Sequence, residues 1–258
     1  MVKKICLSIV IGIVLIVTLP KFVNSDDYPL LNFGYTVFPI KQHDIQMVKE
    51  VVKITPSMPD WKNYPFMLMK TEATFVFKNT SDKKIELEMG FPFGEGTRCE
   101  PFTTTINGQK IKVSKIDTRN DKVRINSEYS YNYTWSITFK PNEQKIVQNI
   151  YYCREIDQHQ GSSEYYVNYI TKSGSLWKGS IKQADFYIAI PPRSVTPIDY
   201  QELLQKLSES PRRCYNHKGW EICRTIKPSG YKIVNGHIEW HFKNWKPSED
   251  ILVVIGRK

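Results

Sequence analysis

The sequence predicts an all-β protein with one short helix, folded as an antiparallel β-sandwich in two packed, sandwich-like lobes. Three observations support this prediction. Short runs of alternating apolar and polar residues recur along the chain, as in strands with one buried face. Turn residues separate these runs at intervals of about eight to twelve residues, which is typical of sandwiches. Only one stretch, at about residues 195–208, has the apolar spacing of a helix.

Residues 1–25 have the layout of a secretory signal peptide. Lys3 and Lys4 precede an apolar stretch at residues 5–19, and small residues lead to Ser25. The apolar stretch is short for a membrane-spanning helix, which needs about 20 residues. We therefore expect cleavage after Ser25 and a protein that is secreted or extracytoplasmic, in the cell envelope. If the segment is kept, it is the only part expected to meet a membrane.

The first predicted lobe covers residues 26–160. Its expected strands lie at residues 33–38, 45–54, 66–78, 85–91, 103–113 (a hairpin), 129–139 and 145–153. Within the hairpin, Asn107 and Gly108 favour a type I′ turn, because both central residues of that turn need a positive φ.

The strand at residues 129–139 has the clearest pattern in the chain. One face carries a row of large apolar residues, namely Tyr129, Tyr131, Tyr133, Trp135, Ile137 and Phe139. A slip of one residue would expose the whole row to water, so the register of this strand is firmly specified. The row could instead be a platform on which a ligand stacks, but a pattern this regular favours the core.

The second predicted lobe covers residues 161–258 and contains the helix. It begins with two alternating runs, at residues 165–170 and 181–190, joined by a link that carries Gly174, Trp177 and Gly179. We expect a hairpin-like connection in which the tryptophan folds over the end of a sheet and closes it. Three further strands are expected at residues 221–226, 237–242 and 251–255.

Four cysteines follow the predicted signal peptide, and an even number in an exported chain predicts disulfides. Four cysteines allow three pairings. Cys214 and Cys223 enclose a short segment that can form a hairpin, and pairing them leaves Cys99 with Cys153. No C-x-x-C motif is present, and only His217 lies near a cysteine pair. We therefore predict no metal site and no cofactor.

The chain is basic, with 36 Lys and Arg residues against 26 Asp and Glu residues and a formal charge of +10. The basic residues are scattered rather than gathered in one run. A scattered excess predicts weak attraction to anionic polymers such as those of a cell surface. The chain has no basic stripe and no nucleic-acid-binding motif, so we predict no nucleic-acid partner.

The segment from His237 to His241 is the strongest candidate for chemistry, because it reads H-x-E-x-H. Zinc proteases place two histidines four apart on a helix with Glu directly after the first, whereas this segment reads as a strand. On a strand the two histidines stand about 13 Å apart, too far to hold one zinc ion. A solvated polar face is the simpler interpretation. Because no hydrolase or phosphate-loop motif is present either, we predict no catalytic residue.

Four tryptophans, Trp61, Trp177, Trp220 and Trp245, lie in or beside predicted loops. An exposed indole ring can stack on a sugar or anchor a protein contact. We take Trp177, Lys178, Trp220 and Trp245 as the candidate binding residues. The alternative is that each tryptophan packs its own loop against the core.

The motif K-x-G-x-x-W-x-G-x-I at residues 172–181, with its flanks at 166–186, resembles a signature of bacterial exported proteins grouped as a family of unknown function. Two weaker resemblances lie at residues 77–79 with 91–92 and at residues 240–251. The resemblance implies an exported, sheet-rich protein. It brings no catalytic residue to this chain.

Two functions of different class remain. The first is a non-catalytic binding protein of the cell envelope or medium, whose partner is an anionic cell-surface polymer or another envelope protein. The second is an exported hydrolase whose acidic residues cannot be identified from sequence. The absence of any catalytic motif favours the first.

Overall fold

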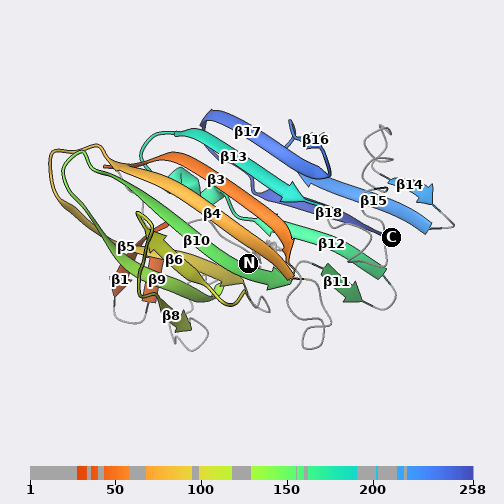
Figure 1. The fold of residues 1–258 in the computed structure, drawn as a ribbon, viewed down its shortest axis with the longest axis horizontal. Coiled ribbons are helices and arrows are strands. Elements are labelled where there is room, and N and C mark those ends of the chain that lie inside the picture. The colour runs from red at the N-terminus through yellow and green to blue at the C-terminus, as the bar shows by residue number, and fades with distance from the viewer. Residues whose placement is uncertain are drawn as a thin grey trace, which may run out of the picture.

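The computed structural model describes residues 28–33, 36–39, 44–57, 68–94, 99–117, 129–154, 156–159, 162–190, 202, 214–217 and 220–257. Within these residues the named elements are β-strands and one short 3-10 helix, which confirms the predicted all-β class. The strands form three sheets in a sandwich-like arrangement (Figure 1). The predicted signal peptide lies outside the described residues, as does the helix predicted at about residues 195–208 apart from Glu202.

An eight-stranded sheet forms one layer of the sandwich. Its spatial order is β16 (Lys232–Val234), β17 (His237–Trp245), β13 (Ile181–Ala189), β3 (Ile45–Ser57), β4 (Leu68–Asn79), β10 (Gln144–Arg154), β6 (Thr103–Ile106) and β7 (Gln109–Lys110). Neighbouring strands are antiparallel except β3 and β13, which run parallel. The predicted antiparallel arrangement therefore holds for every described pair but this one.

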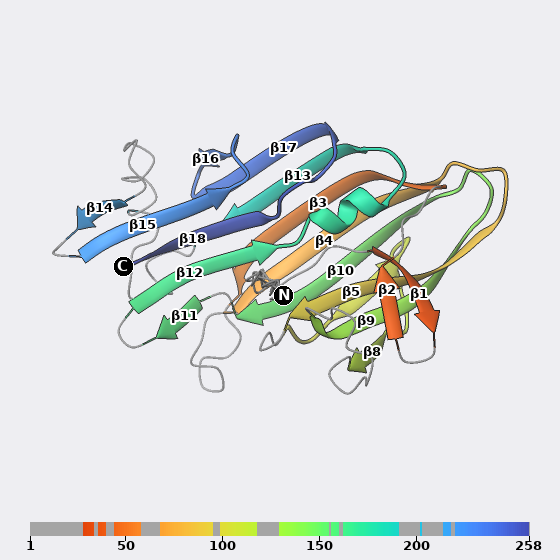
Figure 2. The same cartoon turned by 180° about the vertical axis from the view of Figure 1, so that it is seen from behind.

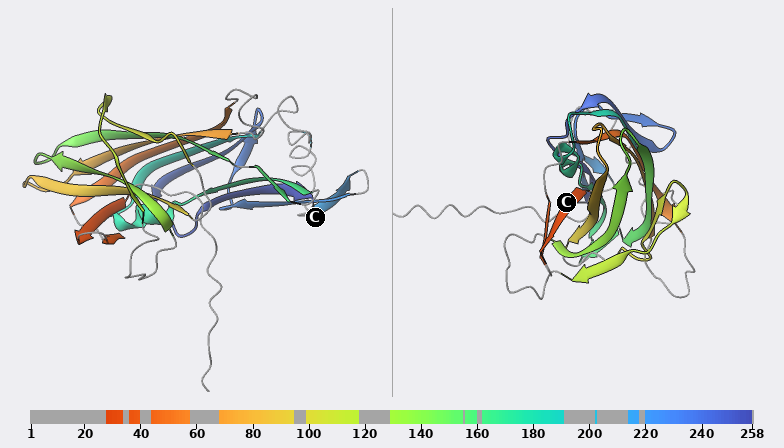
Figure 3. Two further views of the ribbon diagram at one scale, coloured as in Figure 1. Left: turned by 90° about the horizontal axis from the view of Figure 1, so that it is seen from below. Right: turned by 90° about the vertical axis from the view of Figure 1, so that its left-hand side faces the viewer.

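Two five-stranded sheets form the other layer, side by side on one face of the eight-stranded sheet (Figures 2 and 3). One has the order β2 (Thr36–Pro39), β1 (Tyr28–Phe33), β5 (Ile85–Gly94), β9 (Tyr129–Phe139) and β8 (Ser114–Asp117). The other has the order β11 (Ile156–His159), β12 (Ser162–Tyr169), β18 (Ile251–Arg257), β15 (Trp220–Lys227) and β14 (Cys214–His217).

Aromatic side chains join the two layers. Phe91 of β5 packs on Tyr151 of β10, with ring centroids 5.3 Å apart. Tyr169 of β12 packs on Phe186 of β13, with centroids 6.0 Å apart. Tyr151 and Phe186 are both buried and lie on the inner face of the eight-stranded sheet. Successive residues of each strand point to opposite faces, so their neighbours in sequence face outward. The core therefore lies between the large sheet and the pair of smaller ones.

The apolar row of β9 belongs to this core, as predicted. The described members of the row, Tyr133, Trp135, Ile137 and Phe139, are all buried. The side chains of Tyr129 and Tyr131 lie outside the described residues. The ring of Tyr133 stacks on Phe102, with centroids 4.3 Å apart and an interplanar angle of 2°.

The link between β12 and β13 crosses from one sheet to another, so the predicted hairpin-like connection is wrong. β12 pairs with β11 and β18, whereas β13 pairs with β17 and β3. The 3-10 helix η1 (Lys172–Leu176) lies in this link, beside β1. Alternation identifies a strand and its buried face, but it does not identify the strand's neighbours.

Trp177, directly after η1, closes the end of the sheet as the sequence predicts. Its side chain is 2% exposed and packs on Phe77 of β4, with ring centroids 4.6 Å apart. Gly179 has a φ of 71°, which lets the chain turn sharply into β13. The backbone N–H of Lys178 donates to the carbonyl of Ile45, which ties the link to the start of β3.

The large sheet joins strands from both sides of the predicted boundary between residues 160 and 161, since β3 pairs with β13. The division of the chain into lobes at 26–160 and 161–258 stays a prediction.

The disulfide between Cys99 and Cys153 is confirmed. Cys223 is also disulfide-bonded, and Cys214 lies directly opposite it in the register of β14 and β15. Disulfides persist in oxidising compartments, so these bonds fit the predicted extracytoplasmic location. Among the described residues, no helix is long and apolar enough to cross a membrane.

Candidate functional site

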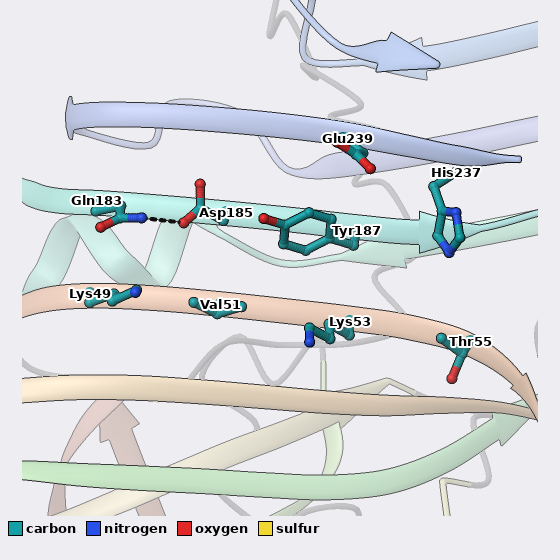
Figure 4. A pocket seen from close by; sticks show the side chains of 9 residues that line it. All are labelled: Lys49, Val51, Lys53, Thr55, Gln183, Asp185, Tyr187, His237 and Glu239. Atoms are coloured by element: carbon teal, nitrogen blue, oxygen red, sulfur yellow. Dashed lines mark hydrogen bonds between the residues drawn. The ribbon is translucent and has the colours of Figure 1, made fainter. Parts of the chain in front are cut away.

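A polar groove lies on the outer face of the eight-stranded sheet, the face turned away from the core (Figure 4). Its volume of about 610 Å³ falls in the range of about 300–1,000 Å³ found for small-ligand sites. Strands β3, β13 and β17 supply the lining residues, which are Lys49, Val51, Lys53, Thr55, Gln183, Asp185, Tyr187, His237 and Glu239.

Strand register brings these side chains together in rows across the sheet. Tyr187 of β13 stands opposite Lys53 of β3 on one side and Glu239 of β17 on the other. Two residues along β13, Asp185 stands opposite Val51 and His241 in the same way. The outward residues of β13 can be polar because the alternate residues, such as Phe186, supply its buried face.

The β3 side of the groove is cationic. Lys49 and Lys53 are four residues apart and face outward, so their Cα atoms stand about 13 Å apart. Within the described part of the chain, neither lysine forms a salt bridge. The groove therefore presents two ammonium groups outside any salt bridge, although Glu72 of β4, which pairs with Lys70, stands opposite Lys53.

The opposite side of the groove is acidic and carries a hydrogen-bonded cluster. Asp185 Oδ1 lies 2.8 Å from Nδ1 of His241, and Glu239 Oε2 lies 3.3 Å from Nε2 of the same ring. Gln183 Nε2 donates a hydrogen bond to Asp185 Oδ2. The Asp185 side chain is 11% exposed and that of His241 is 45% exposed. The cluster is therefore largely buried at Asp185 and open to solvent at His241.

This cluster favours the protonated form of His241. The hydrogen bond that His241 donates to Asp185 raises the pKa of His241 above its ordinary value of 6.5, burial opposes the rise, and Glu239 adds to it. A protonated ring donates from both nitrogens, one to each carboxylate. When the ring is protonated, one imidazolium therefore donates to both carboxylates.

Tyr187 supplies a neutral hydroxyl and an aromatic surface at the centre of the groove. Burial raises the pKa of Tyr187, and the charges of Asp185 and Glu239 raise it further, so the phenol keeps its proton. Its ring meets that of His241 edge-on, with centroids 5.6 Å apart. Tyr187 can therefore donate a hydrogen bond and offer an apolar ring face at the same place.

The H-x-E-x-H segment lies on β17, as predicted, and its polar residues face outward. Ile238 and Trp240 are buried on the other face. Within the described residues, no group of three or more His, Cys, Asp or Glu side chains is placed to hold a metal ion. The outward face is more organised than a solvated strand, because His241 and Glu239 are joined to Asp185 of the neighbouring strand.

The described lining of the groove includes none of the four residues predicted to bind a ligand. Trp177 is buried and leaves no exposed ring face for stacking, so the loop-packing alternative describes it. Trp245 stacks on Phe242 with centroids 4.3 Å apart, and Lys178 Nζ donates to Thr80 Oγ1 at 2.7 Å. The side chain of Trp220 lies outside the described residues. A binding role for Lys178, Trp220 or Trp245 stays a prediction.

Sequence reasoning missed the groove because its lining comes from strands more than one hundred residues apart. One local signal was available. Asp185 interrupts the apolar run at residues 184–190, and a carboxylate in such a run must have a polar partner or a polar environment.

The fold is similar to a crystal structure of a candidate nutrient-binding protein from Legionella pneumophila, with a TM-score of 0.62. The two chains are 20% identical, and the match covers 90% of this chain and 70% of that one. At this identity the likeness concerns the fold alone.

Two further solved structures give weaker matches. An M1 zinc metallopeptidase from Deinococcus radiodurans aligns with a TM-score of 0.31 and 10% identity, over 85% of this chain and 43% of that one. Yeast LTA4 hydrolase aligns with a TM-score of 0.32 and 10% identity, over 83% and 29%. These scores carry no argument about function. No family model matches the sequence, and no curated protein sequence matches it.

Proposed function

We propose that this chain is an exported, non-catalytic binding protein and that the groove between β3, β13 and β17 is its ligand site. The observation that carries the proposal is the pair Lys49 and Lys53, two ammonium groups on the wall of an open groove that form no salt bridge with any described residue. Such a pair attracts a ligand with negative charge. The ligand is therefore anionic, as the basic composition of the chain also predicts.

Export is supported by two independent features, the order of residues 1–25 and the disulfide between Cys99 and Cys153. A binding role also agrees with the description of the Legionella pneumophila protein that shares this fold. The two proteins share a fold, and a shared fold supports a binding role but does not establish it by itself.

The groove supports binding better than catalysis. Its lining residues include no serine or cysteine that could act as a nucleophile. Asp185 and Glu239 both contact the ring of His241, so neither carboxylate is positioned to act independently as a general acid or a general base. Hydrolysis, the alternative function, would need one carboxylate to give up a proton and the other to act on water or substrate.

The proposal is tested with the double variant Lys49→Gln, Lys53→Gln. Binding of three anions of different chemistry, an oligogalacturonate, a polyphosphate and a poly-glutamate, is measured by titration calorimetry at low and high salt. Exposed charge pairs contribute about 0.2–1 kcal/mol each, so the double variant should bind its anion roughly 2- to 30-fold more weakly. Binding should also weaken with salt.

The matched control is the double variant Lys78→Gln, Lys243→Gln. Both lysines are exposed on the same sheet but do not line the groove, and the net charge changes equally. The control should retain wild-type affinity. If none of the three anions binds, or if both double variants lose the same affinity, the groove is not an anion site. Cleavage of a bound polymer would contradict the non-catalytic role.

A further inference from the structure

We infer that the ligand of the groove is an acidic polysaccharide, a chain of sugar rings that carry carboxylates. This inference rests on the proposed binding function and names the class of its ligand. It follows from the division of the groove into a cationic side, an acceptor-rich side and an aromatic centre (Figure 4).

The cationic side offers two similar positions. Lys49 stands opposite the amide side chain of Gln183, and Lys53 stands opposite the phenol of Tyr187. Each position thus combines one ammonium group with one neutral polar group from β13. The two positions are about 13 Å apart along β3. A ligand with a single negative group would use only one of them, whereas a polymer with a negative group in every unit can use both.

The acceptor side argues against a polymer made only of negative groups. Asp185 lies one strand away from β3 and within about 10 Å of both lysines, whereas Glu239 lies two strands away and about 10 Å from Lys53. Carboxylates repel phosphates, but they accept hydrogen bonds from hydroxyl groups. A ligand that spans the groove must therefore present negative groups along one edge and hydrogen-bond donors along the other. A sugar acid has both, since each ring carries one carboxylate and several hydroxyls.

Tyr187 provides the third element, an aromatic ring on the central strand β13, between Lys53 of β3 and Glu239 of β17. Its phenol is neutral and its ring is half-buried on the sheet. The apolar face of a sugar ring can pack on such a ring while its hydroxyls reach the flanking polar groups. A linear phosphate polymer has no apolar face for this contact. An acidic peptide has apolar groups, but it lacks a row of hydroxyls that can donate further hydrogen bonds to Asp185 and Glu239, beside those from His241 and Gln183.

The test compares ligands that differ in one feature at a time, using the purified protein. A galacturonic acid oligomer is titrated against its methyl ester, which keeps the rings and hydroxyls but has no charge, and against a polyphosphate and a poly-glutamate of similar length. We expect the oligogalacturonate to bind most tightly. Its methyl ester should bind roughly 2- to 30-fold more weakly, because the lysines lose their partners.

Tyr187→Leu separates the sugar contact from simple charge attraction. This variant keeps the lysines and should weaken oligogalacturonate binding several-fold while leaving polyphosphate binding unchanged. Tyr152→Leu, which makes the same change on β10 at a position that does not line the groove, is the matched control and should keep the wild-type affinity. Circular dichroism and the unfolding midpoint of each variant show whether the sheet is intact.

The outcomes separate this inference from the proposed function. If polyphosphate or poly-glutamate binds more tightly than oligogalacturonate, and Lys49→Gln with Lys53→Gln abolishes that binding, the polysaccharide inference is overturned and the groove remains an anion site. If Tyr187→Leu weakens all anions equally, the aromatic contact with sugar is overturned. If no anion binds, both the inference and the proposed function fail.

Discussion

Asp185 and His241, 56 residues apart in the chain, meet across the pair β13 and β17 with Oδ1 and Nδ1 2.8 Å apart. The hydrogen bond that Asp185 accepts from His241 is the largest of the causes that raise the pKa of His241. The pair links a strand from the middle of the chain to one near its C-terminus, and it sets the charge of one side of the groove.

The first prediction concerns this pair. Asp185→Asn should lower the pKa of His241 toward its ordinary value of 6.5, because a neutral amide no longer stabilises the imidazolium. Glu239→Gln should lower it less, since its 3.3 Å contact is the weaker one. The measurement is the NMR titration of the His241 ring proton. An unchanged titration in Asp185→Asn would show that the hydrogen bond does not control this histidine.

The same pair gives a pH dependence of stability with a definite sign. The pKa is raised in the folded state, so the stabilisation is fully present below about 6.5 and is lost as the pH rises through the folded pKa. The His241 side chain is 45% exposed, which limits the contribution to about 1 kcal/mol or less. Anion binding should weaken in the same pH range, by roughly twofold at a separation of about 10 Å.

Glu50 gives the second prediction, because its carboxyl group is fully buried on the inner face of β3. Burial raises the pKa of Glu50 to about 8, and the Tyr169 hydroxyl partly offsets that rise. Above about pH 4.5 the unfolded chain releases this proton while the folded protein keeps it. Stability should therefore fall between about pH 4.5 and 8, with a slope approaching about 1.4 kcal/mol per pH unit from this group.

Glu50→Gln removes this titration, so its free energy of unfolding should change less between pH 5 and pH 8 than that of the wild type. Urea unfolding at several pH values measures the difference. Glu249→Gln is the control, because Glu249 is exposed. If Glu50→Gln and wild type lose stability in parallel across this range, Glu50 is ionised in the folded protein and the account of its burial is incorrect.

The buried faces of the strands could be predicted from sequence because alternation reports them directly. Trp135 and Phe186 are buried as their patterns indicate. The turn at Asn107 and Gly108 has positive φ at both residues, 50° and 79°, because type I′ geometry requires it and these residues tolerate it.

The partners of the strands could not be predicted in the same way. The parallel pair of β3 and β13 joins residues that are more than one hundred positions apart, and period-two alternation carries no information on which strand is the neighbour. The groove is lined by residues of both β3 and β13, so it could not be predicted without that strand pair. Lys53 and Tyr187 each look like an ordinary outward residue until the register places them side by side.

The disulfide between Cys99 and Cys153 gives the third prediction. It joins the start of the segment before β6 to the end of β10, across 54 positions of sequence. The double variant Cys99→Ser, Cys153→Ser should lose about 2–5 kcal/mol of unfolding free energy. Urea unfolding with and without reductant measures the loss. The wild type in reductant should approach the variant, and a variant as stable as the oxidised wild type would rule out a stabilising role.

Asp250 gives the fourth prediction, because it fixes η1 from outside. Its Oδ1 accepts hydrogen bonds from the backbone N–H groups of Thr171 and Lys172, at 3.0 and 3.2 Å. Asp250→Ala leaves both donors without this acceptor and should cost about 1–3 kcal/mol. Hydrogen exchange at residues 171–176 should accelerate. Glu249→Ala, one position away and exposed, should leave that exchange unchanged if the carboxylate of Asp250 is the cause.

Trp177 gives the last prediction, and it separates the two interpretations of the tryptophan-containing link. The indole is 2% exposed and packs on Phe77, so Trp177→Ala should leave a cavity and cost about 3–5 kcal/mol. Trp177→Phe should recover part of that loss because a ring still fills the site. Urea unfolding measures both variants. Lys178→Ala, the exposed neighbour, should change stability by less than about 1 kcal/mol. A Trp177→Ala protein as stable as wild type, with ligand binding lost, would instead make this residue part of a binding surface.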